Sequence, residues 1–135
     1  MLSVFTYANV SQSQKDALVA LYNATDGDTW NTSWNLDQPI TEWYGLTIED
    51  DNVIAIDLSF NNLSGKLPSE ISQLTFLKTL NLAFNKLEGK LPETLTSMIN
   101  LETLQLFSNN FSGSLPSDIG NMANLKTVEL YNNNF

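Results

Sequence analysis

The chain has 135 residues, of which 15 are acidic and 6 are basic, so its formal net charge is −9. It contains no cysteine, histidine or arginine, which excludes a disulfide framework, a thiol nucleophile and the commonest general base and metal ligand. An acidic chain with scattered lysines has no basic stripe for phosphates, so we expect no nucleic-acid partner. The composition, 42% hydrophobic and 16% charged, predicts one folded domain.

Residues 1–10, MLSVFTYANV, allow two interpretations. An apolar run at residues 2–5 precedes small residues at Thr6 and Ala8, which resembles the end of a signal peptide, although the basic n-region is missing. The alternative is an ordinary first strand or tail. No stretch of the chain approaches the about 20 apolar residues that a membrane-spanning helix needs.

Residues 11–52 do not repeat, and we interpret them as an N-terminal cap. Ser13 is expected to cap a helix from about Gln14 to Asn23. Three tryptophans follow, at positions 30, 34 and 43. They could stack on carbohydrate, but sealing the open end of an apolar core explains them better. The acidic residues at 26, 28 and 49–51 lack a complete calcium loop, so we predict no metal site.

An internal repeat of 24 residues occupies the rest of the chain, in copies 53–76, 77–100 and 101–124 and a partial copy 125–135. Each copy opens with apolar residues in the strand period of two, and continues with an asparagine at position 61, 85, 109 or 133. The asparagine amide can satisfy turning backbone groups inside a coil. A Leu-Pro pair at 67–68, 91–92 or 115–116 then leads into a short helical segment.

The pattern L-x-x-L-x-L-x-x-N-x-L-x-G-x-L-P over residues 53–135 resembles the plant-type subclass of leucine-rich repeat proteins. The resemblance implies a right-handed α/β solenoid with a parallel sheet on the concave face, short helical turns on the convex side and a helical cap. It also implies a second short strand near residues 63–64, 87–88 and 111–112. The cap of this subclass normally carries a cysteine pair that this chain lacks, so we expect a bacterial or other microbial relative.

In such a coil, the strand residues between the inward anchors project outward in columns. The last two columns are Ser59, Ala83, Phe107 and Tyr131, and Phe60, Phe84, Ser108 and Asn132. One aromatic residue per copy stands there beside a column of amides and carboxylates, an arrangement typical of protein interfaces. The predicted ligand-binding residues of the concave face are Asp57, Phe60, Asn81, Phe84, Gln105, Phe107, Glu129 and Tyr131.

These columns predict a non-catalytic recognition module for a protein or peptide ligand. No carboxylate pair, for example Asp57 with Glu102, gathers a third group around it, so we expect neither catalysis nor a cofactor. Other open interpretations are a structural spacer, a sensor ectodomain of a larger cell-surface protein, and a binder of cell-wall polysaccharide. A threonine column at positions 79, 103 and 127 also raises ice binding, although three rungs are few.

The resemblance and the leader-like start together place the protein outside the cell or on its surface. The sequence stops within a repeat at Phe135, so we expect a fragment of a longer protein. Leu125, Val128 and Leu130 would then form an open edge of the coil, through which self-association can occur.

Overall fold

The computed structural model describes residues 8–135. The segment interpreted as a leader or tail, residues 1–10, lies mostly outside the described residues. No helix of the described part is long and apolar enough to cross a membrane.

The first element of the described residues is a helix, α1 (Gln12–Ala24), which is capped by Ser11. The Ser11 Oγ accepts a hydrogen bond from the Gln14 N–H at 3.3 Å. The expected cap at Ser13 is therefore wrong, because Ser13 already lies within the first helical turn. Gln14 is buried, and its amide bonds to the Asn52 side chain and the Val53 N–H, which fixes the helix to the first strand of the coil. Two short 3-10 turns, η1 (Gly27–Thr29) and η2 (Ile40–Glu42), complete the block before the coil.

The main sheet has five strands in the order β1-β2-β4-β6-β8. An antiparallel hairpin of β1 (Leu46–Glu49) and β2 (Asn52–Asp57) starts it. The remaining strands are parallel and pair at an offset of 24 residues: β4 (Thr79–Asn81), β6 (Thr103–Gln105) and β8 (Thr127–Glu129). The register of the parallel strands therefore follows the 24-residue period of the sequence.

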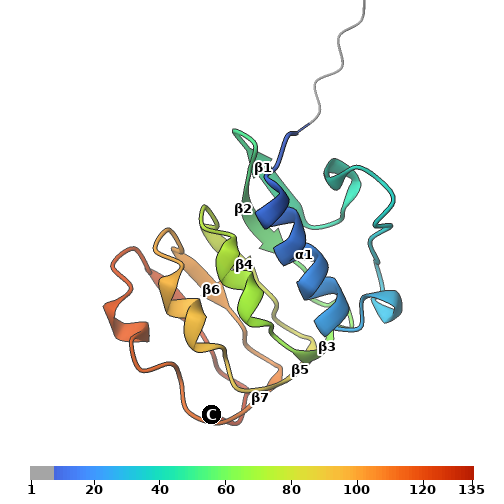
Figure 1. Ribbon diagram of the computed structural model, residues 1–135. Coiled ribbons are helices and arrows are strands. Elements are labelled where there is room, and N and C mark those ends of the chain that lie inside the picture. Colours follow the sequence, from blue (N-terminus) through green and yellow to red (C-terminus); the bar gives the residue numbers. More distant parts are fainter. Residues whose placement is uncertain (1–7) are drawn as a thin grey trace, which may run out of the picture.

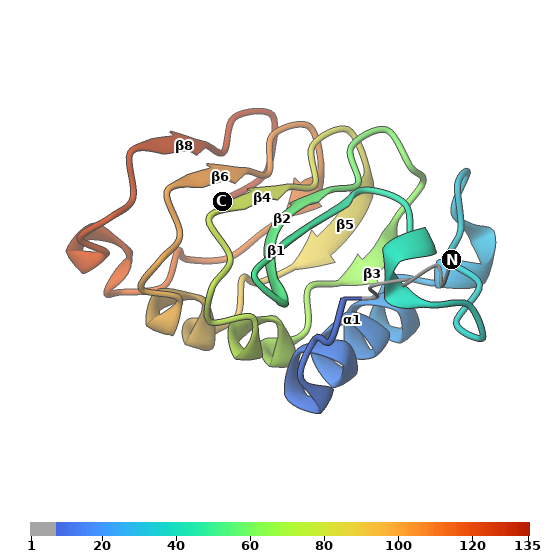
Figure 2. The ribbon, with the colours of Figure 1, turned by 90° about the horizontal axis from the view of Figure 1, so that it is seen from above.

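A second sheet and a row of 3-10 turns close each coil. The sheet holds the expected second strands, β3 (Ser64–Lys66), β5 (Lys86–Gly89) and β7 (Asn110–Phe111). The turns are η3 (Ser69–Gln73), η4 (Glu93–Ser97) and η5 (Ile119–Asn121). Figure 1 shows α1 beside η3, and Figure 2 shows the five-stranded sheet on one side of the coil with the 3-10 turns on the opposite side. The α/β solenoid expected from the sequence, with a parallel sheet on one side and short 3-10 turns on the other, is confirmed.

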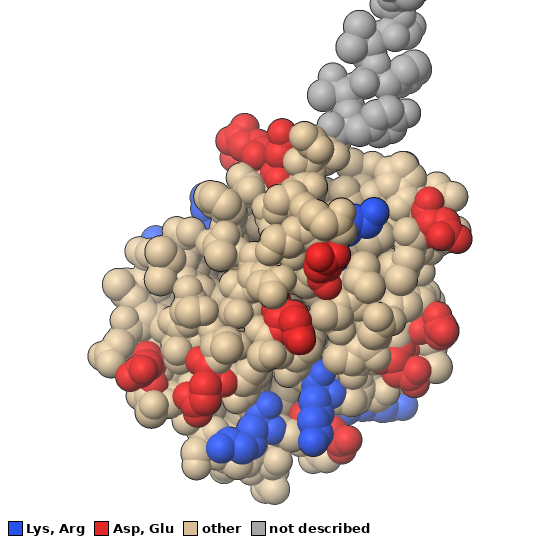
Figure 3. All heavy atoms as spheres, in the orientation of Figure 1, with Lys and Arg blue, Asp and Glu red and all other residues tan. Residues whose placement is uncertain are grey.

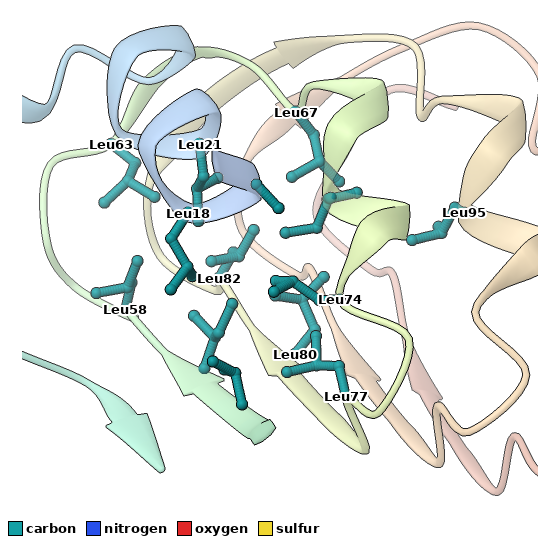
Figure 4. Packing of buried hydrophobic residues seen from close by; sticks show 14 of the residues in the cluster. Leu18, Leu21, Leu58, Leu63, Leu67, Leu74, Leu77, Leu80, Leu82 and Leu95 are labelled. Atoms are coloured by element: carbon teal, nitrogen blue, oxygen red, sulfur yellow. The ribbon is translucent and has the colours of Figure 1, made fainter. Parts of the chain in front are cut away.

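Leucines from successive coils form one continuous core (Figure 4). Leu58, Leu82 and Leu106 occupy equivalent positions, and each is fully buried. Burial decreases in the last coil, where Val128 is 44% exposed and Leu125 and Leu130 are only partly buried. The solenoid therefore shares its core from the cap to residue 124, and the final strand covers it incompletely.

The repeated asparagines form a ladder along the inside of the coils. The Asn85 Oδ1 accepts hydrogen bonds from the backbone N–H groups of Asn61 and Leu63 at 3.0 and 2.9 Å. Its Nδ2 donates to the carbonyl of Leu58 at 3.0 Å and to that of Leu82 at 2.9 Å. Asn109 and Asn133 repeat this pattern with one backbone N–H each, that of Leu87 and that of Phe111, and with a carbonyl of the preceding coil. Each asparagine therefore satisfies backbone groups of the coil that precedes its own.

Candidate binding surface on the concave face

Four of the predicted site residues lie side by side at the ends of the parallel strands. They are Asp57, Asn81, Gln105 and Glu129. The first two accept hydrogen bonds from their own turns, Asp57 from the Ser59 N–H at 3.1 Å and Asn81 from the Ala83 N–H at 3.1 Å. The last two bond to each other, with the Gln105 Nε2 donating to Glu129 at 2.9 Å. The column is thus a polar strip whose members are already oriented.

The other four predicted residues form one continuous row of rings, called here the aromatic row: Phe60, Phe84, Phe107 and Tyr131. The first pair is stacked, with ring centroids 4.0 Å apart and planes at 15°. The middle pair is edge-to-face, at 5.1 Å and 82°, and the last pair is stacked again, at 4.6 Å and 12°. The separations of the middle and last pairs fall in the range at which aromatic pairs attract each other, and the first pair is closer still.

The row is continuous although its members come from two different columns of the sequence. At equivalent positions of the four coils the backbone enters the left-handed region, with φ between 53° and 56°, at Phe60, Phe84, Ser108 and Asn132. In the first two coils the aromatic residue itself takes the left-handed position. In the last two it precedes that position. The sequence period therefore assigns these aromatic residues to two columns, although their rings form one row in the structure.

The left-handed backbone at Phe60 and Phe84 is costly. A non-glycine residue pays about 1–2 kcal/mol for this conformation, and a short polar residue such as asparagine tolerates it best. The third and fourth coils place Ser108 and Asn132 there, which follows that preference. The first two coils keep a phenylalanine instead, so local backbone energetics alone do not explain these residues. Strain of this kind is characteristic of functional positions.

The aromatic row faces solvent. Phe60 is 66% exposed, Phe84 44% and Tyr131 54%, whereas Phe107 is half-buried. Ala83, which the column analysis also placed outward, is fully buried, a correction explained by its short side chain beside the larger Phe84 in the same turn. A contiguous exposed strip of rings is uncommon on a protein surface without a binding role.

Charge on the molecule is dispersed. Figure 3 shows acidic side chains spread over one face with few lysines among them. On the concave sheet, Lys126 Nζ pairs with Glu102 at 3.1 Å, and both side chains are exposed, so the pair contributes little to stability. Within residues 8–135 no group of three or more carboxylates is placed to hold a metal ion. The threonines at 79, 103 and 127 do lie in register on neighbouring strands.

The three tryptophans of the cap are internal. Trp30, Trp34 and Trp43 are each no more than 5% exposed, and each indole N–H donates to a backbone carbonyl. The carbohydrate-stacking interpretation of these residues is wrong, because a buried ring has no free face for a sugar. Their burial is what the expected sealing role requires. Tyr22 packs against the same cluster, and the hydrogen bond from its hydroxyl to Asp28 raises the pKa of Tyr22.

Comparison with known proteins supports this architecture. A profile of the family described as Leucine Rich Repeat matches residues 52–74, 76–98 and 100–122, together just over half of the chain. A probable leucine-rich repeat receptor-like protein kinase of Arabidopsis thaliana is 47% identical over 77 residues, which cover 56% of this chain and 8% of that protein.

Two solved structures are similar over nearly the whole chain. The crystal structure of PEPR1–AtPEP1 superimposes with a TM-score of 0.80 at 29% identity, covering 91% of this chain and 18% of that one. The leucine-rich repeat ectodomain of the receptor kinase SOBIR1 from Arabidopsis thaliana also gives 0.80, at 23% identity, covering 94% of this chain and 70% of that one. This chain therefore spans less than a fifth of the kinase and of the PEPR1 chain.

Proposed function

The chain belongs to the leucine-rich repeat family, and we propose that it is a non-catalytic recognition module that binds a protein or peptide ligand through its concave face. The observation that carries the proposal is the aromatic row. Its first two rings are kept at left-handed backbone positions where an asparagine would fit better, and its rings remain largely exposed. Such rings supply large contact area at small entropic cost, as interface hot spots do.

The eight residues have two roles in this proposal. The aromatic row provides apolar anchors along the axis of the coil. The strip of Asp57, Asn81, Gln105 and Glu129 provides polar groups that orient the ligand and discriminate between partners. Both sets are held by backbone and neighbouring-coil contacts, so little conformational freedom is lost on binding.

We place the module in a larger protein at the cell surface or outside the cell, with residues 11–52 as its cap and residues 53–135 as its binding coil. The similar kinase of Arabidopsis is receptor-like, and the similar structure of PEPR1 is a complex with AtPEP1. A protein or peptide ligand for this chain is consistent with both. The missing cap cysteines favour a microbial member of the plant-type subclass.

Affinity capture from the extracellular and envelope extract of the source organism tests this proposal. Three baits are compared: the unaltered chain, the double variant Phe84→Ser/Phe107→Ser, and Phe76→Ser. Phe76 is 48% exposed but lies outside the aromatic row, so its variant is a matched control for the loss of one exposed ring. Circular dichroism first establishes that all three are folded.

We expect a specific partner to be retained by the unaltered chain and by Phe76→Ser, and to be lost with the double variant. Loss of a hot-spot ring lowers affinity by about 2 kcal/mol or more, enough to remove a partner during washing. The same proteins on all three baits, or none on any, would contradict the proposal and support the structural-spacer interpretation.

A further inference from the structure

An open pocket of about 290 Å³ lies where the aromatic row meets the cap. Its lining residues are Asn31, Phe60, Asn62, Phe84, Asn85 and Lys86. They come from three segments that are distant in sequence: the cap, the turn of the first coil and the turn of the second. Its size is at the lower end of small-molecule sites and corresponds to one ring-sized ligand.

One wall of the pocket is a fixed apolar platform. Phe84 covers one face of the Phe60 ring, yet Phe60 is two-thirds exposed, so its other face is open. The backbone N–H groups of Phe60 and Phe84 donate to carbonyls of the following coils, Ala83 and Phe107, each at 3.1 Å. These bonds hold both left-handed residues in place. The platform therefore exists before any ligand arrives.

Two asparagines beside the platform have unused hydrogen-bonding capacity. The Asn31 Nδ2 donates to the Phe60 carbonyl at 3.3 Å, and the Asn62 Nδ2 donates to the Thr29 carbonyl at 2.9 Å. Each bond orients an amide and leaves it a second N–H, and neither Oδ1 accepts a hydrogen bond from another residue of the described chain. Asn85 differs, because its amide is fully engaged in the ladder and only forms a wall.

The charge of the pocket is opposite to that of the protein. The chain has 15 acidic residues, and none of them is among the residues that line this pocket. Lys86, one of only six basic residues, lines it, and its ammonium group forms no ion pair with a carboxylate in residues 8–135. A ligand that carries a carboxylate is therefore favoured there over a neutral or cationic one.

We propose that this pocket binds a hexuronate, a pyranose ring with a carboxylate at C6. The C–H face of such a ring packs on the open face of Phe60. Adjacent hydroxyls each donate and accept, which matches the free N–H and Oδ1 groups of Asn31 and Asn62. The carboxylate pairs with Lys86. No single feature of the pocket is specific, but an acidic sugar uses all three at once.

Titration of the ¹⁵N-labelled chain with D-galacturonic acid, followed by NMR, tests this assignment. We expect chemical-shift changes in the side-chain amides of Asn31 and Asn62 and in the backbone amide of Lys86. D-galactose has the same ring hydroxyls but a hydroxymethyl group in place of the carboxylate, and we expect it to bind about tenfold more weakly. N-acetylglutamate has the carboxylate without the ring, and we expect no saturable shifts at these amides. A trigalacturonate distinguishes a free sugar from a residue within a polysaccharide, which we expect to bind more tightly.

Two matched pairs of variants locate the site. Lys86→Gln should weaken galacturonate binding about tenfold, whereas Lys90→Gln, an equal charge change outside the pocket, should leave it within twofold. Phe60→Asn should also weaken binding, and Phe76→Ser should not. Equal binding of galactose and galacturonate, equal binding of N-acetylglutamate, or unchanged spectra would each overturn the proposal. Phe60 and Phe84 also belong to the aromatic row, so the affinity-capture experiment, which has a protein readout, decides separately whether a protein ligand occupies the concave face.

Discussion

The molecule contains two groups of four aromatic rings with similar internal geometry and opposite surroundings. In the cap, Tyr22, Trp30, Trp34 and Trp43 form a cluster with centroids 4.9–5.2 Å apart along the chain of contacts. In the aromatic row the corresponding separations are 4.0–5.1 Å. The cap cluster is at most 8% exposed, whereas three rings of the row are 44–66% exposed.

The difference shows that ring geometry does not distinguish a core from an interface. The two groups differ in whether their polar atoms are hydrogen-bonded inside the protein and in the conformation of the surrounding backbone. In the cap every indole N–H is bonded to a carbonyl, as burial requires. In the row two rings sit on strained left-handed backbone and remain open to solvent. The first arrangement stabilises the fold, and the second is the one on which the proposed binding role rests.

Trp34→Ala should give the largest loss of stability, because Trp34 contacts all three other rings of the cap cluster. Removing a buried tryptophan leaves a cavity and lowers the free energy of unfolding by about 3–5 kcal/mol. Urea denaturation followed by circular dichroism measures the change. A loss of about 0.5 kcal/mol or less, the level of a surface change, would remove the distinction between the two groups.

Tyr22→Phe should lower the free energy of unfolding by about 1–2 kcal/mol, since it removes the hydroxyl that donates to Asp28. The same bond raises the pKa of Tyr22 above its usual value of 10.0. Above pH 10 the unfolded state loses this proton before the native state does, so the stability of the unaltered chain should fall as the pH rises. Below pH 10 the contribution is fully present. Stability against pH should be flatter above pH 10 in the variant, and parallel curves would contradict this account.

Phe107→Ala should cost about 1 kcal/mol, because a half-buried ring that stacks on Tyr131 and meets Phe84 edge-on loses both contacts. Thermal unfolding checks the value. A loss as large as that of Trp34→Ala would mean that the aromatic row is a structural core rather than a surface group.

Phe60→Asn should change stability by no more than about 0.5 kcal/mol, since the lost stacking on Phe84 is offset by a better fit to the left-handed backbone. Phe60→Val is the matched comparison. It also removes the ring, but a β-branched residue is strained at φ of 53°, so this variant should be clearly less stable than Phe60→Asn. Equal stabilities for the two would show that backbone strain has no part in the aromatic row.

The coil was predictable because the same residue types recur at the same positions in all four copies of the repeat. The inward leucines, the asparagine ladder and the second strands all follow from positions such as Leu58, Asn61 and Ser64 that recur at a fixed offset. The cap has no second copy to compare, and its helix start was misplaced by two residues. Two serines stand there, and only the backbone geometry selects Ser11 over Ser13.

The site was predictable as a set of residues but not as a shape. Periodicity assigns Phe84 and Phe107 to different columns, but their rings are in contact. The left-handed turn that brings them together contains no glycine at that position, so the sequence does not indicate it. Asn31 illustrates a second limit. It lies 29 residues from Phe60, and only the seating of the cap against the first coil makes it part of the pocket.

The asparagine ladder makes the two ends of the solenoid inequivalent. Since each rung satisfies the coil before it, the loss of one coil leaves orphaned backbone donors in its predecessor, such as the N–H of Phe111 when Asn133 moves away. Nearest-neighbour coupling is therefore unequal toward the two ends. We expect hydrogen exchange to show opening that begins at β8, where the core is thinnest, and advances coil by coil, with the amides of β2 beside the cap exchanging last.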